Sequence, residues 1–126
     1  MEKDLLSIDY TSAYSTPSLD KLVRTFVYDR QGKGSFTVGD EFTANAPIRF
    51  ETAITTQANW KIIDDTHLLL TTGTEQMTVT IEASGKVAFT SETIEVNSPA
   101  YTRIGISLKE QSKDGYIRLT MRTKQL

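Results

Sequence analysis

Hydrophobic and polar positions alternate with a period of two along most of the chain, a pattern that predicts β-strands. The clearest case is residues 22–38, where two such runs are joined by a turn at 31–34 that contains two glycines. Glycine adopts positive φ at little cost, so this segment predicts a β-hairpin. Both faces of the first run carry apolar side chains, so we expect the hairpin to be central or covered and to organise the fold. One face holds Leu22, Arg24, Phe26 and Tyr28, and the other Val23, Thr25 and Val27.

The rest of the chain predicts more strands, separated by turn residues. Pro47, after Ala46, predicts a break, and the turn at 83–85 leads one strand into the next. Residues 11–19 and 109–115 are expected to be connections. A helical turn over 17–23, capped by Thr16, is the competing interpretation of the first one. The other expected strands cover 5–10, 48–56, 60–63, 67–71, 76–82, 86–90, 93–96, 101–108 and 116–122.

About ten strands with this spacing predict an all-β fold, an antiparallel β-sandwich. The length of 126 residues suits a single domain over residues 1–126. The predicted core is Phe26, Phe36, Val38, Phe42, Ile48, Phe50, Ile54, Met77, Val79, Ile81, Val87, Phe89, Ile104, Ile106, Leu108, Ile117 and Leu119.

Composition and charge narrow the classes of function. Fourteen basic and sixteen acidic residues give a net charge of −2, so the chain lacks the positive field that attracts nucleic acid. The absence of cysteine excludes disulfides and cysteine-ligated metals. No apolar run is long enough to span a bilayer, and no signal-peptide core follows the charged residues 1–4. We therefore expect no nucleic acid and no membrane as partners, and an export signal would lie on a larger precursor.

Candidate catalytic groups are sparse. His67 is the single histidine and cannot build a His-rich metal site; we interpret it as a strand-end residue with a satisfied ring, the alternative being one contact to an acidic or hydroxylated partner. The acidic pairs at 40–41 and 64–65 point to opposite sides of a strand, so we expect turn residues and solvated charges. Calcium loops, phosphate loops and serine nucleophile elbows are absent from the sequence. The residues predict no cofactor and no catalysis by this chain on its own.

Carbohydrate binding is a second class of function to consider. Trp60 lies outside the strongest alternating runs, and an exposed tryptophan can stack on a sugar ring. Lys61, Arg49 and Arg103 would pair with an anionic sugar, and Tyr101 would add a second ring. The opposing interpretation is a core tryptophan, with the basic residues on solvated strand faces and Tyr101 packed inward. The sequence leaves both interpretations open.

The sequence has an Asp-x-Thr-x-Ala-Tyr phrase at Asp9–Tyr14, then Arg-Thr-Phe at Arg24–Phe26 and Asp-x-Phe at Asp40–Phe42. In this order the phrases resemble the C-terminal part of heparinase II/III-type polysaccharide lyases, in which the first phrase precedes an Arg-Thr-Phe strand and an Asp-x-Phe hairpin. The resemblance covers nearly the whole chain. The segments that carry it are 8–14, 22–30, 38–42, 50–54, 99–106 and 116–120.

The resemblance implies a part of a larger enzyme. Such lyases join an α/α toroid to β-sandwich domains and cleave uronic-acid polysaccharides by β-elimination with tyrosine and histidine. A chain of this length has no room for the toroid, and Tyr10, Tyr14 and His67 match no catalytic motif, so no catalytic residue is transferred. The family's zinc site needs histidines that this chain lacks. The expectation is a non-catalytic accessory sandwich, periplasmic or secreted, which braces the catalytic part or helps it bind acidic polysaccharide.

Two other functions stay open beside the accessory role: a free-standing carbohydrate-binding module and a structural or assembly domain. The expected partners are the rest of a lyase chain or an adjacent catalytic subunit, and an acidic polysaccharide is a further possible partner.

One structural expectation is the same for all three functions. Because an arginine on a covered strand is costly to bury unpaired, Arg24 should reach the rim or meet a carboxylate such as Asp40 or Glu51.

Overall fold

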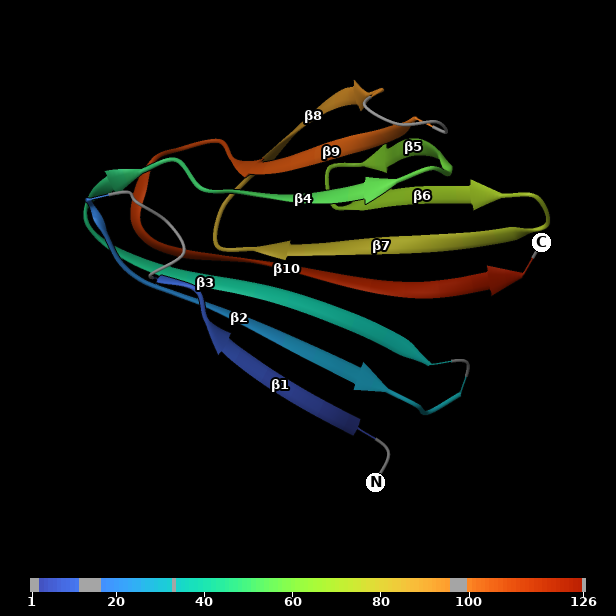
Figure 1. Ribbon diagram of the computed structural model, residues 1–126, viewed down its shortest axis with the longest axis horizontal. Coiled ribbons are helices and arrows are strands. Elements are labelled where there is room, and N and C mark those ends of the chain that lie inside the picture. Colours follow the sequence, from blue (N-terminus) through green and yellow to red (C-terminus); the bar gives the residue numbers. More distant parts are fainter. Residues whose placement is uncertain (1–2, 12–16, 33, 96–99, 126) are drawn as a thin grey trace.

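The computed structural model describes residues 3–11, 17–32, 34–95 and 100–125. Within these ranges the regular elements are all strands, ten in number, which confirms the all-β fold class (Figure 1). The strands are β1 (Lys3–Asp9), β2 (Leu19–Asp29), β3 (Ser35–Ile48), β4 (Glu51–Thr56), β5 (Asn59–Asp64), β6 (His67–Thr72), β7 (Glu75–Ala83), β8 (Val87–Ile94), β9 (Tyr101–Leu108) and β10 (Ser112–Gln125).

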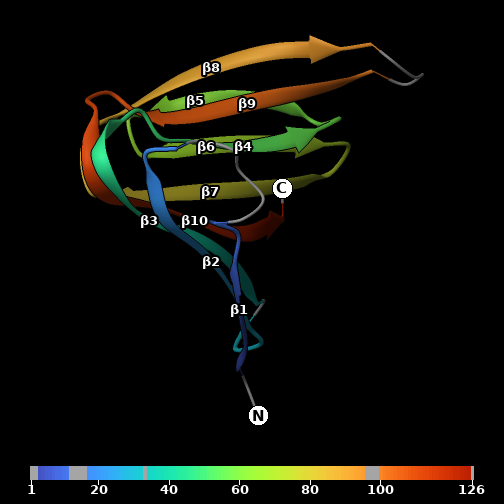
Figure 2. The ribbon, with the colours of Figure 1, turned by 60° about the vertical axis from the view of Figure 1, so that its left-hand side comes forward.

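The strands form two antiparallel sheets. The larger sheet has the order β1-β2-β3-β10-β7-β6-β5, and the smaller sheet has the order β4-β9-β8. The smaller sheet packs over β10, β7, β6 and β5 and over the neighbouring ends of β2 and β3 (Figures 1 and 2). The far ends of β1, β2 and β3 extend beyond it. The expected antiparallel sandwich is thus confirmed, with two layers of unequal extent.

The hairpin predicted at residues 22–38 forms inside the larger sheet, between β1 and β10. Gly32 and Gly34 have φ angles of 61° and 84°, the positive values that the turn requires. Lys33, the remaining residue between these two glycines, lies outside the described residues. Cross-strand partners in β2 and β3 are Leu22 with Phe42, Arg24 with Asp40, Phe26 with Val38, and Tyr28 with Phe36.

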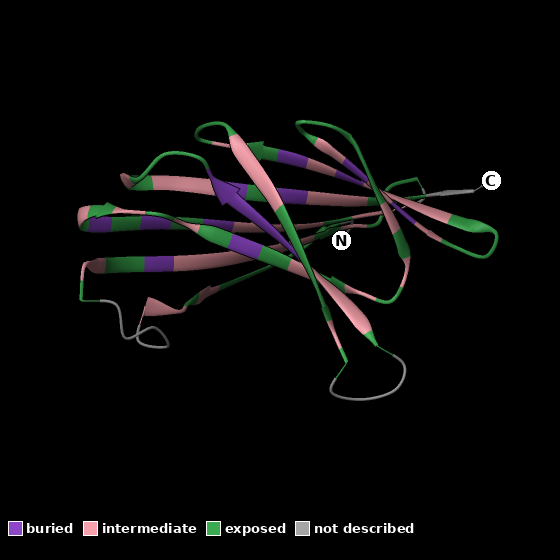
Figure 3. Ribbon diagram, turned by 90° about the horizontal axis from the view of Figure 1, so that it is seen from above, coloured by how far each residue is buried: buried purple, intermediate pink, exposed green. Residues whose placement is uncertain are grey.

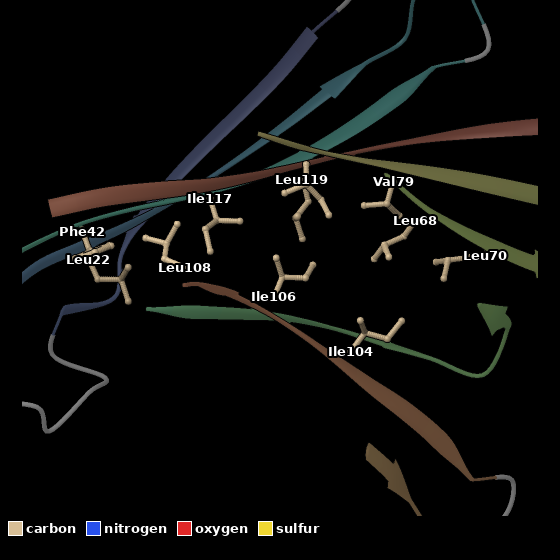
Figure 4. Packing of buried hydrophobic residues seen from close by; sticks show 11 residues of the cluster. Leu22, Phe42, Leu68, Leu70, Val79, Ile104, Ile106, Leu108, Ile117 and Leu119 are labelled. Atoms are coloured by element: carbon tan, nitrogen blue, oxygen red, sulfur yellow. The ribbon is translucent and has the colours of Figure 1, made fainter. Parts of the chain in front are cut away.

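The core lies where the two sheets overlap. Ile104 and Ile106 of β9 are fully buried and point toward the side chains of the larger sheet, among them Leu68 and Leu119 (Figure 4). In β3, β6 and β7 buried positions alternate with more exposed ones, as a two-layer packing requires, whereas β9 is buried at every position from Ile104 to Leu108 (Figure 3). The buried apolar residues are Leu22, Phe42, Ala44, Leu68, Leu70, Val79, Ile81, Ile104, Ile106, Leu108, Ile117 and Leu119.

The predicted core is correct where the sheets overlap and wrong at the end of the hairpin. Phe36 is 39% exposed, and Phe26 and Val38 are only half-buried, because the smaller sheet does not reach this end. Leu68 and Leu70 are buried although the core prediction omits them, since the unbroken leucine run 68–70 shows no alternation. Other predicted core members that are partly buried against the core are Ile48, Phe50, Ile54, Met77, Val87 and Phe89.

The break predicted at Ala46 and Pro47 is wrong. Strand β3 continues to Ile48, and the segment expected as one strand over 48–56 is divided between β3 and β4. Proline lacks the N–H that a ladder needs, but the pairing of β3 with β10 is already irregular here, with a register shift between Ser112 and Asp114. Pro47 therefore interrupts no regular run of hydrogen bonds.

Other boundaries also differ from the prediction. The turn at 83–85 joins the two sheets, since β7 belongs to the larger and β8 to the smaller. The strands predicted at 86–90 and 93–96 are one element, β8, and Val96 lies outside the described residues. The helical turn over 17–23 does not form because β2 begins at Leu19; its expected cap, Thr16, also lies outside the described residues. Strand β10 begins within the predicted connection 109–115.

Candidate functional site

An ion pair crosses the inner face of the larger sheet, the face turned toward the smaller sheet. Arg24 donates Nε to Oδ1 of Asp40 at 2.6 Å and Nη2 to Oδ2 at 2.8 Å. This confirms the expectation that Arg24 meets a carboxylate. The interpretation of Asp40 as a solvated turn charge is wrong: it lies within β3 and is 3% exposed. The Arg24 guanidinium also lies 5.6 Å from the centre of the Tyr10 ring.

Beyond this ion pair the inner face carries a group of apolar side chains that no described part of the chain covers fully. We call the five residues concerned the open face: Leu6 on β1, Phe26 and Tyr28 on β2, and Phe36 and Val38 on β3. They are cross-strand neighbours, with Leu6 opposite Phe26 as well as the two hairpin pairs given above. The side chains of Leu6 and Tyr28 are 57% and 46% exposed. The Phe26 and Phe36 rings contact each other with centroids 6.1 Å apart.

The open face is the feature that the prediction of sites missed. Its signal was present in the sequence, because Phe26 and Tyr28 alternate on the face opposite Val23 and Val27. That pattern predicted cover on both faces of β2. The structure supplies cover only near Leu22, where the two sheets overlap.

The structure does not gather the five carbohydrate candidates at one place. Trp60 pairs with Leu70 on the inner face and packs against the core, whereas Lys61 is exposed on the opposite face of β5. Tyr101 and Arg103 lie on β9 of the other sheet, and Arg103 donates Nη2 to Glu51 Oε2 at 2.9 Å. Arg49 is exposed in the link between β3 and β4.

His67 begins β6 and has partners within the chain. Its Nδ1 lies 2.8 Å from Asp64 Oδ1 and 3.0 Å from Thr66 Oγ1. The backbone amide of Thr66, followed by the His67 ring, lowers the pKa of the Asp64 carboxyl. This turn satisfies Nδ1 of the ring, which agrees with the strand-end interpretation.

Two other kinds of feature are absent from the described residues. In the described part of the chain, three or more histidine, aspartate or glutamate side chains nowhere form a group that could hold a metal ion. The same residues contain no helix with the length and hydropathy needed to cross a membrane.

The fold of the chain resembles that of a known protein, although its sequence does not. No protein-family profile matches the chain, and no curated protein matches it in sequence. Among solved structures, one described as a heparinase III gene product superposes with a TM-score of 0.63 at 13% identity. The match covers 99% of this chain and 20% of the heparinase III chain, so the chain spans about a fifth of that protein's length. At 13% identity this likeness establishes the fold of the chain. It confirms the resemblance to heparinase-type proteins at the level of the fold.

Proposed function

We propose that this chain is a non-catalytic accessory β-sandwich of a heparinase II/III-like polysaccharide lyase and that it braces the catalytic part by docking through the open face. The observation that carries the proposal is the unequal size of the two sheets. Exposed apolar clusters rimmed by polar groups are typical of protein interaction sites. Leu6, Tyr28 and Phe36 form such a cluster, and Arg24 and Asp40 lie at its inner boundary.

The choice of a lyase as the partner that docks on the open face rests on the likeness to heparinase III. A fold that covers 99% of this chain accounts for only a fifth of the heparinase III chain, so there it is accompanied by a much larger remainder. A lyase remainder is therefore a partner of suitable size for the open face. Such a lyase would act on polysaccharide outside the cytoplasm, which favours a periplasmic or secreted location.

The surroundings of His67 support a non-catalytic role. The catalysis that the family resemblance implies pairs a histidine with a tyrosine, whereas the cross-strand partners of His67 are Asp64 and Thr80. A general acid and base must both stand within reach of the same substrate. We expect no rise in ultraviolet absorbance from β-elimination when the chain is incubated with heparan sulfate, alginate or hyaluronan.

Docking is tested by binding to the α/α toroid of a heparinase III-type lyase that lacks its own terminal sandwich, measured by calorimetry. The Phe36→Lys substitution places a charge on the open face and should abolish the heat of binding. Ile63→Lys is the matched control, because Ile63 on β5 is 52% exposed and lies far from β1 in the strand order. Unchanged binding by Phe36→Lys, or failure of the unmodified chain to bind, would contradict the proposal. Concentration-dependent self-association that Phe36→Lys removes would identify a second copy as the occupant instead.

A further inference from the structure

A hollow of about 220 Å³ lies on the outer face of the larger sheet, on the side away from the smaller sheet. Gly39 of β3 is at its centre, with Thr25 of β2 and Arg118 of β10 as its direct cross-strand neighbours. The adjoining rows of the sheet form the walls. The wall side chains are Val27 and Thr37 on one side and Glu41 and Tyr116 on the other.

The fold itself does not explain Gly39. A glycine within a strand weakens it, because it restricts the unfolded chain least and offers no side chain for packing. Among the described residues positive φ occurs at Gly32, Gly34 and Gly73, so the backbone at residue 39 does not require glycine. A Cβ added there would lie 3.8 Å from Arg118 Cγ, an ordinary contact distance, so the packing does not require it either. Close approach of a ligand is a recognised reason for glycine in a strand.

The side chains around the hollow are held by neighbours. The Thr25 hydroxyl lies 3.1 Å from the Ser7 hydroxyl, and the Thr37 hydroxyl lies 3.2 Å from that of Thr120. Such contacts fix rotamers before a ligand arrives, which lowers the entropic cost of binding.

Arg118 is fixed in two ways. It donates Nη1 to Glu82 Oε2 at 3.0 Å, and its guanidinium lies 5.4 Å from the centre of the Tyr116 ring. The guanidinium carries five N–H donors, so the bond to Glu82 leaves others to face a ligand. The hollow therefore has a positioned donor on one side of Gly39.

The chemistry of the walls selects a class of ligand. Hydroxyls of Thr25 and Thr37 both donate and accept, Glu41 accepts, and Arg118 donates, while the Val27 side chain adds an apolar surface. Two carboxylates, Glu41 and Glu82, stand near the single guanidinium, which disfavours an anion. Sites for drug-sized ligands usually occupy about 300–1,000 Å³, so this smaller hollow suits a compact ring. We propose that it binds one neutral pyranose unit of a glycan, independently of docking at the open face.

The test is a titration of the full chain with glucose, galactose, mannose, xylose and glucuronate, followed by amide chemical shifts in NMR spectra. At least one neutral sugar should shift the amides of Gly39, Thr25 and Arg118 saturably, with a Kd of about 1 mM or weaker, and glucuronate should bind less well. Gly39→Val fills the hollow with a side chain that suits a strand, so this variant should fold and lose at least about tenfold in affinity.

Gly85→Ala is the matched glycine control, because a Cβ at residue 85 meets nothing within 4 Å and that residue does not line this hollow. Its titration should equal that of the unmodified chain. Absence of a saturable shift with every neutral sugar would overturn the proposal. Unchanged affinity in a folded Gly39→Val protein, or tightest binding of glucuronate, would overturn it as well.

Discussion

Arg24 and Asp40 face each other across β2 and β3, and two parallel hydrogen bonds of 2.6 Å and 2.8 Å join the guanidinium to both carboxylate oxygens. On one side of the pair Leu22 and Phe42 are buried in the core, and on the other Phe26 and Val38 belong to the open face. The pair thus separates the apolar surface that the fold uses itself from the apolar surface available to a partner.

Removing one member of this pair should destabilise the fold. Arg24→Met leaves the Asp40 carboxylate without its guanidinium at a side chain that is only 4% exposed. Loss of one partner from a buried pair costs about 3–5 kcal/mol; because Arg24 is 31% exposed, we expect the lower end of that range. Urea unfolding followed by circular dichroism measures the change.

The double substitution Arg24→Leu with Asp40→Leu is the control for this interpretation. It removes both charges of the pair, so neither carboxylate nor guanidinium is left without the other, and its free energy of unfolding should return to within about 1 kcal/mol of the unmodified chain. A double variant as unstable as Arg24→Met would show that packing, and not the ion pair, determines the loss.

Because the smaller sheet covers only part of the inner face, truncating a covered side chain should cost more stability than truncating one on the open face. Ile106 is fully buried between the sheets, so Ile106→Ala should lower the free energy of unfolding by about 2–5 kcal/mol. Leu6 is 57% exposed on the open face, and Leu6→Ala should cost about 0.5 kcal/mol. Equal losses in thermal or urea unfolding would show that the isolated chain covers its open face in solution.

Two glycines should respond in opposite ways to alanine. Gly39→Ala should raise the free energy of unfolding by about 0.5–1 kcal/mol, because alanine suits a strand better and the added Cβ has room. At Gly115 the Cβ would lie 2.7 Å from Ser84 Oγ and 3.1 Å from Phe42 Cε1, so Gly115→Ala should cost about 1–3 kcal/mol. Denaturant midpoints of the two variants check the signs, and a destabilised Gly39→Ala would remove the argument that the fold leaves Gly39 unexplained.

The acid titration of Asp9 should depend on Thr11. The Thr11 hydroxyl, and then its backbone amide, lowers the pKa of the Asp9 carboxyl from the ordinary value of 3.8. A carboxyl whose pKa is lowered by folding stabilises the folded state at any pH above its unfolded-state pKa. This contribution is lost as the pH falls through the folded-state pKa. Thr11→Val should raise the pKa of Asp9 toward 3.8 in a carbon-detected NMR titration and leave that of Asp64 unchanged. Equal pKa values of Asp9 in both proteins would contradict this assignment.

A substitution at Trp60 tests whether this residue belongs to a carbohydrate site or only to the core. Its side chain packs against the core, so Trp60→Ala should lower the free energy of unfolding by about 1–3 kcal/mol. Because Trp60 faces inward, a glycan array signal of the unmodified chain should survive in a folded Trp60→Ala protein. A signal lost with that substitution would restore Trp60 and the basic residues near it as a carbohydrate site.

The sequence was sufficient for the class of the fold and for the hairpin, since alternation and the turn glycines are local signals. It also predicted a carboxylate partner for Arg24, because the cost of an unpaired charge does not depend on topology. The sequence did not predict which strands belong to which sheet. The turn at 83–85 reads like any hairpin turn, yet β7 and β8 separate into different sheets.

That distribution decides which apolar residues are covered. Phe36 and Phe42 have similar sequence surroundings, but only Phe42 lies under the smaller sheet. The hollow at Gly39 likewise arises from three strands, and Arg118 reaches it from far along the chain. Neither the open face nor the hollow could therefore be located without knowing the strand order.

The position of β10 has a consequence for how the chain folds. It is the last strand along the chain among those described, yet it lies in the middle of the larger sheet between β3 and β7. Thr37 and Thr120, neighbours across this junction, are 83 positions apart. Long-range pairing of this kind slows folding. During synthesis the edges of β3 and β7 that pair with β10 stay unpaired until β10 emerges, so this part of the nascent chain is most exposed to aggregation just before β10 is made.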